Sequence, residues 1–276
     1  MSKLEEVPVL RVVPVANLVL HEEIDPRRAE GLMHRIREDG VLKNPPVVAP
    51  MNKPGYYVVL DGANRVAALA GLGIRDAVVQ VVDYNKVHVD TWNHLVAGID
   101  GSTLFEEIRR IPGVVVRQAD LETARRLWRE RAILAYIVGR DGDVYLIEAG
   151  SDLRQSARLL VELCDIYRGQ ATIYRVQTDD TGELRSYYDD VAATVIYPPF
   201  QPTDILELAS NSAKLPTGIT RHVIPRRALR VNIDLDFLAA DRPLVEKNEW
   251  LQTWLRRKLQ NKEVRYYEEP TFLFDE

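Results

Sequence analysis

Apolar residues in the first hundred positions are grouped into short blocks, and polar segments separate them. Strand-like blocks cover residues 9–15, 45–50, 56–60 and 76–82. Between them, helical spacing of apolar residues predicts a helix over 25–40 and another after residue 62. The alternation of short strands with short helices predicts a mixed sheet covered by helices, which is an α/β fold.

The helix predicted over residues 25–40 carries signals for both of its ends. Asp25 is expected as the N-cap, Pro26 occupies the first helical position, and Gly40 follows the last turn. Apolar residues recur inside it at helical spacing, namely Ala29, Leu32, Met33 and Ile36. One face of this helix should therefore pack on the sheet.

The pattern changes near residue 100, where a helix is expected to start with Ser102 as its cap. Further helices are predicted over 121–132, 151–167 and 243–260, further strands over 132–139, 143–149, 171–178 and 191–200, and a final extended segment over 264–276. The segment RDGD between residues 139 and 144 is a hairpin signal. We therefore expect two α/β lobes, residues 1–100 and 101–276.

The charge, the cysteine count and the lack of a long apolar run limit the classes of function that the protein can have. The chain has 36 lysines and arginines and 41 aspartates and glutamates, and its net charge of −5 disfavours a general nucleic-acid-binding protein. Cys164 is the only cysteine, so no internal disulfide can form, and its helical setting predicts a buried thiol. The N-terminus lacks signal-peptide features, and no apolar run approaches the ~18 residues of a membrane helix, so we expect a cytoplasmic protein.

The segment VVLDGANR places an aspartate and a glycine between a predicted strand and a predicted helix. In one interpretation Asp61 caps the helix, Gly62 eases the turn and Arg65 is solvated. In the other, the free N–H groups of the helix start bind a phosphate that Arg65 also contacts. The local sequence leaves both interpretations open, and the sequence contains no Walker A motif, kinase glycine loop or GxGxxG.

Three further segments carry candidate chemistry. HEEIDP, with His21, Glu22, Glu23 and Asp25, is either an acid–base or metal cluster or a solvated acidic loop. In DTWNHLV, Trp92 and His94 either line a pocket or belong to the core. In TGITRHVI, Arg221 and His222 form a candidate site for a carboxylate.

In combination, residues 18–48 and 58–74 resemble the ParB/sulfiredoxin superfamily, with the G-x-x-R motif at Gly62–Arg65. Sulfiredoxin chemistry is excluded, because the turn contains no cysteine. ParB proteins continue into a helix-turn-helix region, which is not seen after residue 100. The segments HEEIDP, LKNPP, TWNH and RHVI instead resemble the free serine kinases, although many of these carry histidines where this chain has Ala63 and Asn64.

This resemblance implies a ParB/sulfiredoxin-like N-terminal domain, a second α/β lobe and an active site in the cleft between them. It implies phosphorylation of free L-serine to O-phospho-L-serine by ADP or ATP with Mg²⁺, in a monomer or small homo-oligomer. Glu22 would be the general base, with Glu23 as the alternative, and Asp61 would bind the metal. The implied binding residues are Gly62, Ala63, Asn64, Arg65 and Lys43 for the nucleotide, and Trp92, His94, Arg221 and His222 for serine.

The resemblance also leaves alternatives open. A ParB-like domain can act as a nucleotide-binding regulatory or DNA-associated protein without kinase activity. Two uses of phosphoserine, cysteine synthesis and the supply of a siderophore precursor, are both compatible with the sequence.

Overall fold

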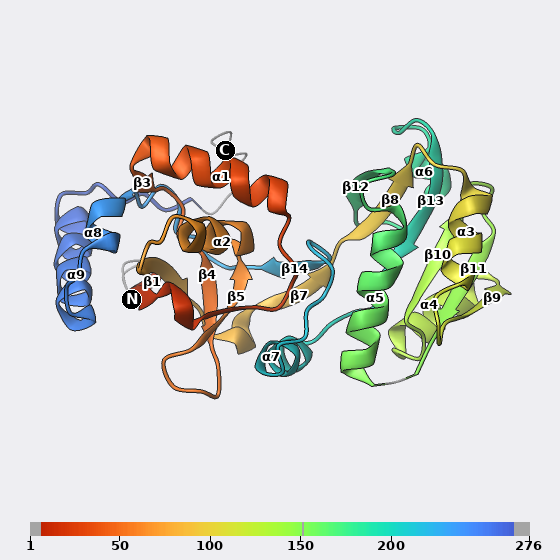
Figure 1. Ribbon diagram of the computed structural model, residues 1–276, viewed down its shortest axis with the longest axis horizontal. Coiled ribbons are helices and arrows are strands. Elements are labelled where there is room, and N and C mark those ends of the chain that lie inside the picture. Colours follow the sequence, from red (N-terminus) through yellow and green to blue (C-terminus); the bar gives the residue numbers. More distant parts are fainter. Residues whose placement is uncertain (1–6, 151, 268–276) are drawn as a thin grey trace.

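The computed structural model describes residues 7–150 and 152–267 and contains two lobes (Figure 1). The first lobe is built on a five-stranded mixed sheet of order β1-β6-β4-β5-β2. Its strands are β1 (Val9–Pro14), β2 (Leu18–Leu20), β4 (Val47–Pro50), β5 (Tyr57–Asp61) and β6 (Asp76–Val81). The four strand-like blocks of the first hundred residues are confirmed as β1, β4, β5 and β6.

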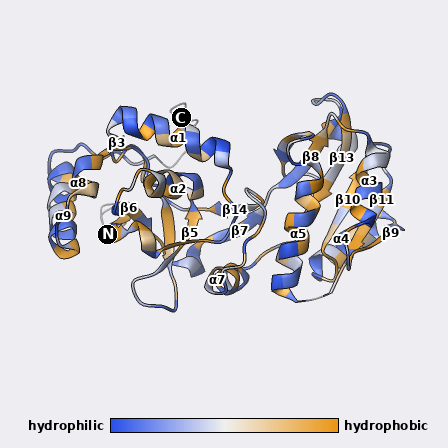
Figure 2. Cartoon of the chain, in the orientation of Figure 1, coloured by the Kyte–Doolittle hydropathy of each residue, from blue (hydrophilic) through white to orange (hydrophobic). Residues whose placement is uncertain are grey.

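Two helices of the first lobe occur where the sequence predicts them. In α1 (Pro26–Asp39), the Asp25 side chain accepts hydrogen bonds from the backbone N–H groups of Arg27 and Arg28, and Gly40 ends the helix at φ +68°. The helix α2 (Ala63–Gly71) starts directly after Gly62 and packs against α1. Figure 2 shows polar residues along the outer side of α1 and apolar residues on the strands beneath.

The second lobe contains a six-stranded sheet of order β12-β8-β13-β10-β11-β9. Its strands are β8 (Asn93–Ala97), β9 (Val115–Ala119), β10 (Ala135–Gly139), β11 (Val144–Glu148), β12 (Thr172–Val176) and β13 (Val191–Ile196). Its helices are α3 (Gly101–Arg109), α4 (Leu121–Arg129), α5 (Leu153–Tyr167) and the short α6 (Thr181–Leu184). The hairpin β10–β11 and the buried thiol of Cys164 on α5 are confirmed.

The predicted cap of α3 was wrong by two residues. The Asp100 side chain accepts the backbone N–H of Thr103 and is the N-cap, while Ser102 lies inside the first turn and donates its hydroxyl to Asp100. Aspartate and serine are both good N-caps. Because Asp100 is the one used, the helix begins at Gly101.

The C-terminal part of the chain returns to the first lobe. After α7 (Pro202–Ser210), β14 (Thr220–Val223) pairs with β7 (His88–Thr91), and these two strands lie between the lobes (Figure 1). Then β15 (Ile233–Asp234) pairs with β3 (Val41–Leu42), before α8 (Leu235–Ala239) and α9 (Leu244–Gln260). The first lobe is therefore completed by residues near the end of the sequence.

The helix α9 is attached to the first sheet by polar contacts as well as by packing. Asn248 accepts the backbone N–H of Val12 at 3.0 Å and donates to its carbonyl at 2.9 Å. The Lys247 ammonium donates to Asp76 at 2.7 Å and to the carbonyl of Leu238 at 2.8 Å, with 1% of Lys247 exposed. These bonds fix α8 and α9 at the edge of the sheet formed by β1 and β6.

The division of the chain at residue 100 stays a prediction; β8 already lies in the second sheet, and α9 packs on β1. The last nine residues of the extended segment predicted over 264–276 lie outside the described residues, as does residue 151 of the predicted helix 151–167. Within the described ranges, every helix is too short or too polar to cross a bilayer.

Candidate active site

Glu22 is the second residue after β2 and forms an isolated parallel β-bridge with Leu215. The backbone N–H of Leu215 donates to the carbonyl of His21 at 2.8 Å, and the N–H of Glu23 donates to the carbonyl of Leu215 at 2.9 Å. These two bonds bring the segment HEEIDP beside TGITRHVI, although almost two hundred residues separate them. Two of the candidate segments therefore form one site.

The carboxylate of Glu22 is fixed by the backbone on this neighbouring segment. The N–H of Gly218 donates to Oε2 at 2.7 Å, and the N–H of Thr220 donates to Oε1 at 2.8 Å. The side chain is 12% exposed. Because backbone amides bind an ionised acceptor strongly and directionally, Glu22 is held in one orientation with limited access to solvent.

His21 and Thr220 extend this arrangement into the core. The Nδ1–H of His21 donates to the carbonyl of Val59 at 2.8 Å, and its Nε2 lies 2.9 Å from the Thr220 hydroxyl. Burial lowers the pKa of His21, although the charge of Glu22 opposes this, so the imidazole is neutral near pH 7. The hydroxyl of Thr220 also contacts Glu22, but its single proton serves only one of these two acceptors at a time.

His222 lies beside His21, with 5.3 Å between the ring centroids. Its Nε2 is 2.9 Å from the hydroxyl of Tyr84. Burial, followed by the neighbouring His21, lowers the pKa of His222 to about 3. A neutral imidazole at this position interacts with a substrate by hydrogen bonding rather than by charge.

The turn at residues 61–65 lies two residues beyond Val59, which His21 contacts. Gly62 has φ +92°, a conformation that favours glycine, and α2 begins at the next residue. The side chain of Asn64 accepts the backbone N–H of Asp25 at 3.1 Å. This bond joins the turn to the segment that carries Glu22.

Asp61 is paired with two arginines in this turn. Arg65 contacts its Oδ2 at 2.6 Å, and Arg227 contacts the same oxygen at 3.0 Å. Burial acts to raise the pKa of Asp61, but the charges and hydrogen bonds of Arg65 and Arg227 outweigh it and hold the pKa below its ordinary value. Asp61 therefore remains ionised and has no role as the cap of α2, whose N-cap is Gly62.

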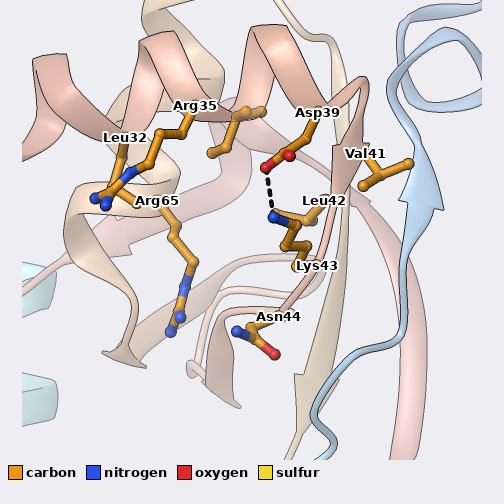
Figure 3. A pocket seen from close by; sticks show the side chains of 9 residues that line it. Leu32, Arg35, Asp39, Val41, Leu42, Lys43, Asn44 and Arg65 are labelled. Carbon is orange, nitrogen blue, oxygen red and sulfur yellow. Dashed lines mark ion pairs between the residues drawn. The ribbon is translucent and has the colours of Figure 1, made fainter. Parts of the chain in front are cut away.

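Lys43 and Arg65 line one small cavity between α1 and the loop after β3 (Figure 3). Lys43 is paired there with Asp39 at 2.7 Å, and Asn44 accepts the backbone N–H of Arg230 at 2.9 Å. The cavity measures about 30 Å³, close to the volume of one water molecule. Two of the predicted nucleotide-binding side chains thus lie together, in a space that has to open to admit a base or a phosphate.

The residues predicted to surround serine fall into two groups. Arg221 lies over the ring of Trp92 at 4.9 Å and is paired with Asp90 at 3.1 Å, in the β7–β14 ladder between the lobes. His94 instead lies in the core of the second lobe, with its Nδ1 3.0 Å from the hydroxyl of Tyr167. Burial, followed by the charges of two arginines, lowers the pKa of His94 to about 3.

Sequence reasoning missed three side chains of this region. Thr220 contacts Glu22, and Arg227 contacts Asp61. Thr220 lies in the segment TGITRHVI and Arg227 shortly after it, so the strand that starts in this segment was the available sequence signal for both. Arg175 lies against Gly218 but comes from the strand β12, where nothing in the local sequence marks it. In the part of the chain that the structure describes, no group of three or more His, Cys, Asp or Glu residues is arranged to bind a metal.

Comparison with known proteins finds named enzymes that are similar to this chain. No protein-family model matches the chain. It is 27% identical over 269 residues to the ATP-dependent L-serine kinase SbnI of Staphylococcus aureus, with 97% of each chain covered. It is 26% identical over 240 residues to an ATP-dependent L-serine kinase of Staphylothermus marinus, with 84% of this chain and 94% of the relative covered.

The solved structure of a free serine kinase in complex with AMP superposes on this chain with a TM-score of 0.71. The match covers 84% of this chain and 95% of that structure at 17% identity, which supports the fold. The mixed α/β fold is confirmed. In sequence and in fold, over most of its length, the chain is similar to the free L-serine kinases.

Proposed function

We propose that the chain is a kinase that transfers a phosphoryl group from ATP or ADP to the hydroxyl of free L-serine, with Mg²⁺, giving O-phospho-L-serine. The observation that carries this proposal is the fixed carboxylate of Glu22, which is connected through His21 and Val59 to the strand that ends at the G-x-x-R turn. A base and an anion site are thus adjacent. Phosphoryl transfer requires such positioning more than it requires covalent chemistry from the protein.

Glu22 is the general base in this reaction. Its carboxylate accepts the proton of the serine hydroxyl as that oxygen bonds to the terminal phosphorus and the bond to the departing nucleotide breaks. The amides of Gly218 and Thr220 hold the carboxylate without supplying a second acid, and the neutral His21 fixes the Thr220 hydroxyl. Glu23 fits this role less well, because it is paired with Arg168 at 2.8 Å.

The phosphates are bound at the start of α2. The free N–H groups of Ala63 and Asn64 and the positive end of the helix dipole favour an anion there, and Gly62 leaves the approach free of a side chain. Arg65 and Lys43 supply positive charge from the same cavity. Both relatives described above are named as ATP-dependent, which makes ATP the first donor to test.

Asp61 provides the carboxylate expected for Mg²⁺. Magnesium in phosphoryl-transfer sites is commonly bound by one or two carboxylates together with substrate phosphates and water, so a single ionised aspartate beside the phosphate turn fits this ion. Both arginine contacts are made by Oδ2 of Asp61. The ion would neutralise charge on the phosphates, while Arg227 and Arg65 keep Asp61 ionised.

The amino acid lies between Glu22 and the β7–β14 ladder. His222 belongs to this ladder and Trp92 directly follows β7, and these two side chains are proposed to contact serine, with Arg221 held over Trp92. His94 acts from the core of the second lobe and supports the strand β8 rather than touching the hydroxyl. The cleft between the lobes, the cytoplasmic location and a monomeric or small homo-oligomeric state remain predictions.

A direct assay tests the proposed function. The protein is incubated with L-serine, Mg²⁺ and either ATP or ADP, and O-phosphoserine is measured by ³¹P NMR. Product is expected with at least one donor and is expected to be absent with L-alanine, which lacks the hydroxyl. Nucleotide binding without product from either donor would instead support a regulatory protein.

Gly62→Ala tests the phosphate turn. A Cβ atom at residue 62 would lie 2.8 Å from two nitrogens of Arg65, at a backbone φ of +92°. We expect nucleotide affinity to fall at least about tenfold, because Arg65 has to move, and stability to fall by about 1–2 kcal/mol from backbone strain. Calorimetric titration with ATP measures the first effect.

Gly73→Ala is the matched control for this turn. Gly73 has φ +69° just after α2, and a Cβ atom there meets nothing within 4 Å. It should show a similar loss of stability with unchanged nucleotide affinity. Equal affinity losses in the two variants would contradict a phosphate site at Gly62.

A further inference from the structure

Arg175 lies against the loop that holds Glu22. A Cβ atom on Gly218 would be 1.7 Å from Arg175 Nη2 and 2.4 Å from its Cζ, so the guanidinium occupies the space that a side chain at residue 218 would need. The N–H of the same glycine donates to Glu22. The guanidinium of Arg175 therefore lies against the same glycine whose N–H binds the proposed general base, Glu22.

The positive charge of Arg175 is not paired with a carboxylate in the described part of the chain. Within residues 7–150 and 152–267, its guanidinium makes no hydrogen bond and no ion pair. Desolvation, followed by the positive charge of Arg28, lowers the pKa of Arg175, while Glu22 and Asp25 act in the opposite direction. An arginine nevertheless stays protonated in proteins. The side chain remains solvent-exposed, so a ligand can reach it.

The position of Arg175 separates it from the phosphate turn. It belongs to β12, an edge strand of the second sheet, whereas the turn is at the end of β5 in the first sheet. The turn has its own cations in Arg65 and Arg227. Arg221, the arginine predicted from sequence to bind a carboxylate, already contacts Asp90. Arg175 is thus a cation near Glu22 that has no carboxylate partner in the described part of the chain.

We propose that Arg175 binds the α-carboxylate of the amino-acid substrate and is a specificity-determining residue for it. This inference rests on the proposed kinase function. A substrate whose hydroxyl is at Glu22 has its carboxylate only a few bonds away, and the planar guanidinium pairs with a carboxylate through two parallel hydrogen bonds. Gly218 permits the close approach because it has no side chain.

The test compares L-serine with L-serinamide, in which a neutral amide replaces the carboxylate. In Arg175→Ala, we expect kcat/KM for L-serine to fall between about tenfold and about a hundredfold, mainly through KM, as is typical for loss of a hydrogen bond to a charged group. The value for L-serinamide should change little, so the preference for the carboxylate should collapse. Arg175→Lys, which keeps the charge but loses the planar fork, should retain part of it.

Arg154→Ala, an exposed arginine on α5, is the control and should preserve the preference. If Arg175→Ala lowers the rates of both substrates equally, or retains the wild-type preference, the assignment is wrong. A fall in kcat with unchanged KM for both would place Arg175 at the transferred phosphoryl group instead. A wild-type protein that forms no phosphoserine rejects the proposed function itself, before any variant is compared.

Discussion

Glu22→Ala is expected to abolish formation of O-phosphoserine while nucleotide still binds. Removal of a positioned general base typically costs between about 10² and about 10⁴ in rate. The nucleotide site at residues 61–65 has its own donors, so its affinity should change less than about threefold. The measurements are the rate of phosphoserine formation and calorimetric titration with ATP.

Two companion variants make this result specific. Glu22→Gln keeps the shape of the side chain but removes its basicity, and should be as inactive as Glu22→Ala. Glu23→Ala breaks an ion pair with Arg168 that is one-third exposed on each side, and should keep most of the activity. Normal turnover in Glu22→Ala would remove Glu22 as the base, and inactivity in Glu23→Ala alone would assign that role to Glu23.

Asp76→Ala is expected to lower the free energy of unfolding by about 3–5 kcal/mol. Asp76 and Lys247 are 2% and 1% exposed, so removing the carboxylate leaves a buried ammonium whose remaining contacts in the described chain are the carbonyl of Leu238 and the ring of Phe237. The lost contact joins α9 to β6. Urea denaturation at pH 7 measures the change.

The neighbouring pair Arg75–Asp241 supplies the control. Asp241 is 95% exposed, so Asp241→Ala should cost less than about 1 kcal/mol. Replacing both buried partners, in Asp76→Leu with Lys247→Met, should recover much of the stability, because no buried charge is then left unpaired. If Asp76→Ala and Asp241→Ala have equal effects, the buried pair does not hold α9 in place.

Local chemistry explains which parts of the fold could be predicted. The ends of α1 follow from Asp25, Pro26 and Gly40, whose preferences act within a few residues. The cap of α3 was misplaced because Asp100 and Ser102 are both good caps, and the sequence alone does not distinguish them. Short-range rules fail where two neighbouring residues satisfy them equally.

The site itself depends on contacts across the whole chain. Glu22 was selected from its segment and from family resemblance, but its orientation comes from the amides of Gly218 and Thr220, which carry no sequence signature. Asp61 was expected beside a metal, and its two arginine partners include Arg227, which is 166 residues away. Arg175 was invisible because an arginine on an edge strand is ordinarily solvated.

The return of the C-terminal segment to the first lobe sets the point in synthesis at which Glu22 can be oriented. Residues 93–196 contain the whole second sheet and can pair as soon as they leave the ribosome, whereas the amide of Gly218 is made 196 residues after Glu22. At about 5–20 residues per second, Glu22 waits roughly 10–40 s for the backbone that orients it. A nascent chain that ends before β14 thus contains Glu22 and the turn at residues 61–65, but it lacks the amide of Thr220 that helps to hold the carboxylate of Glu22.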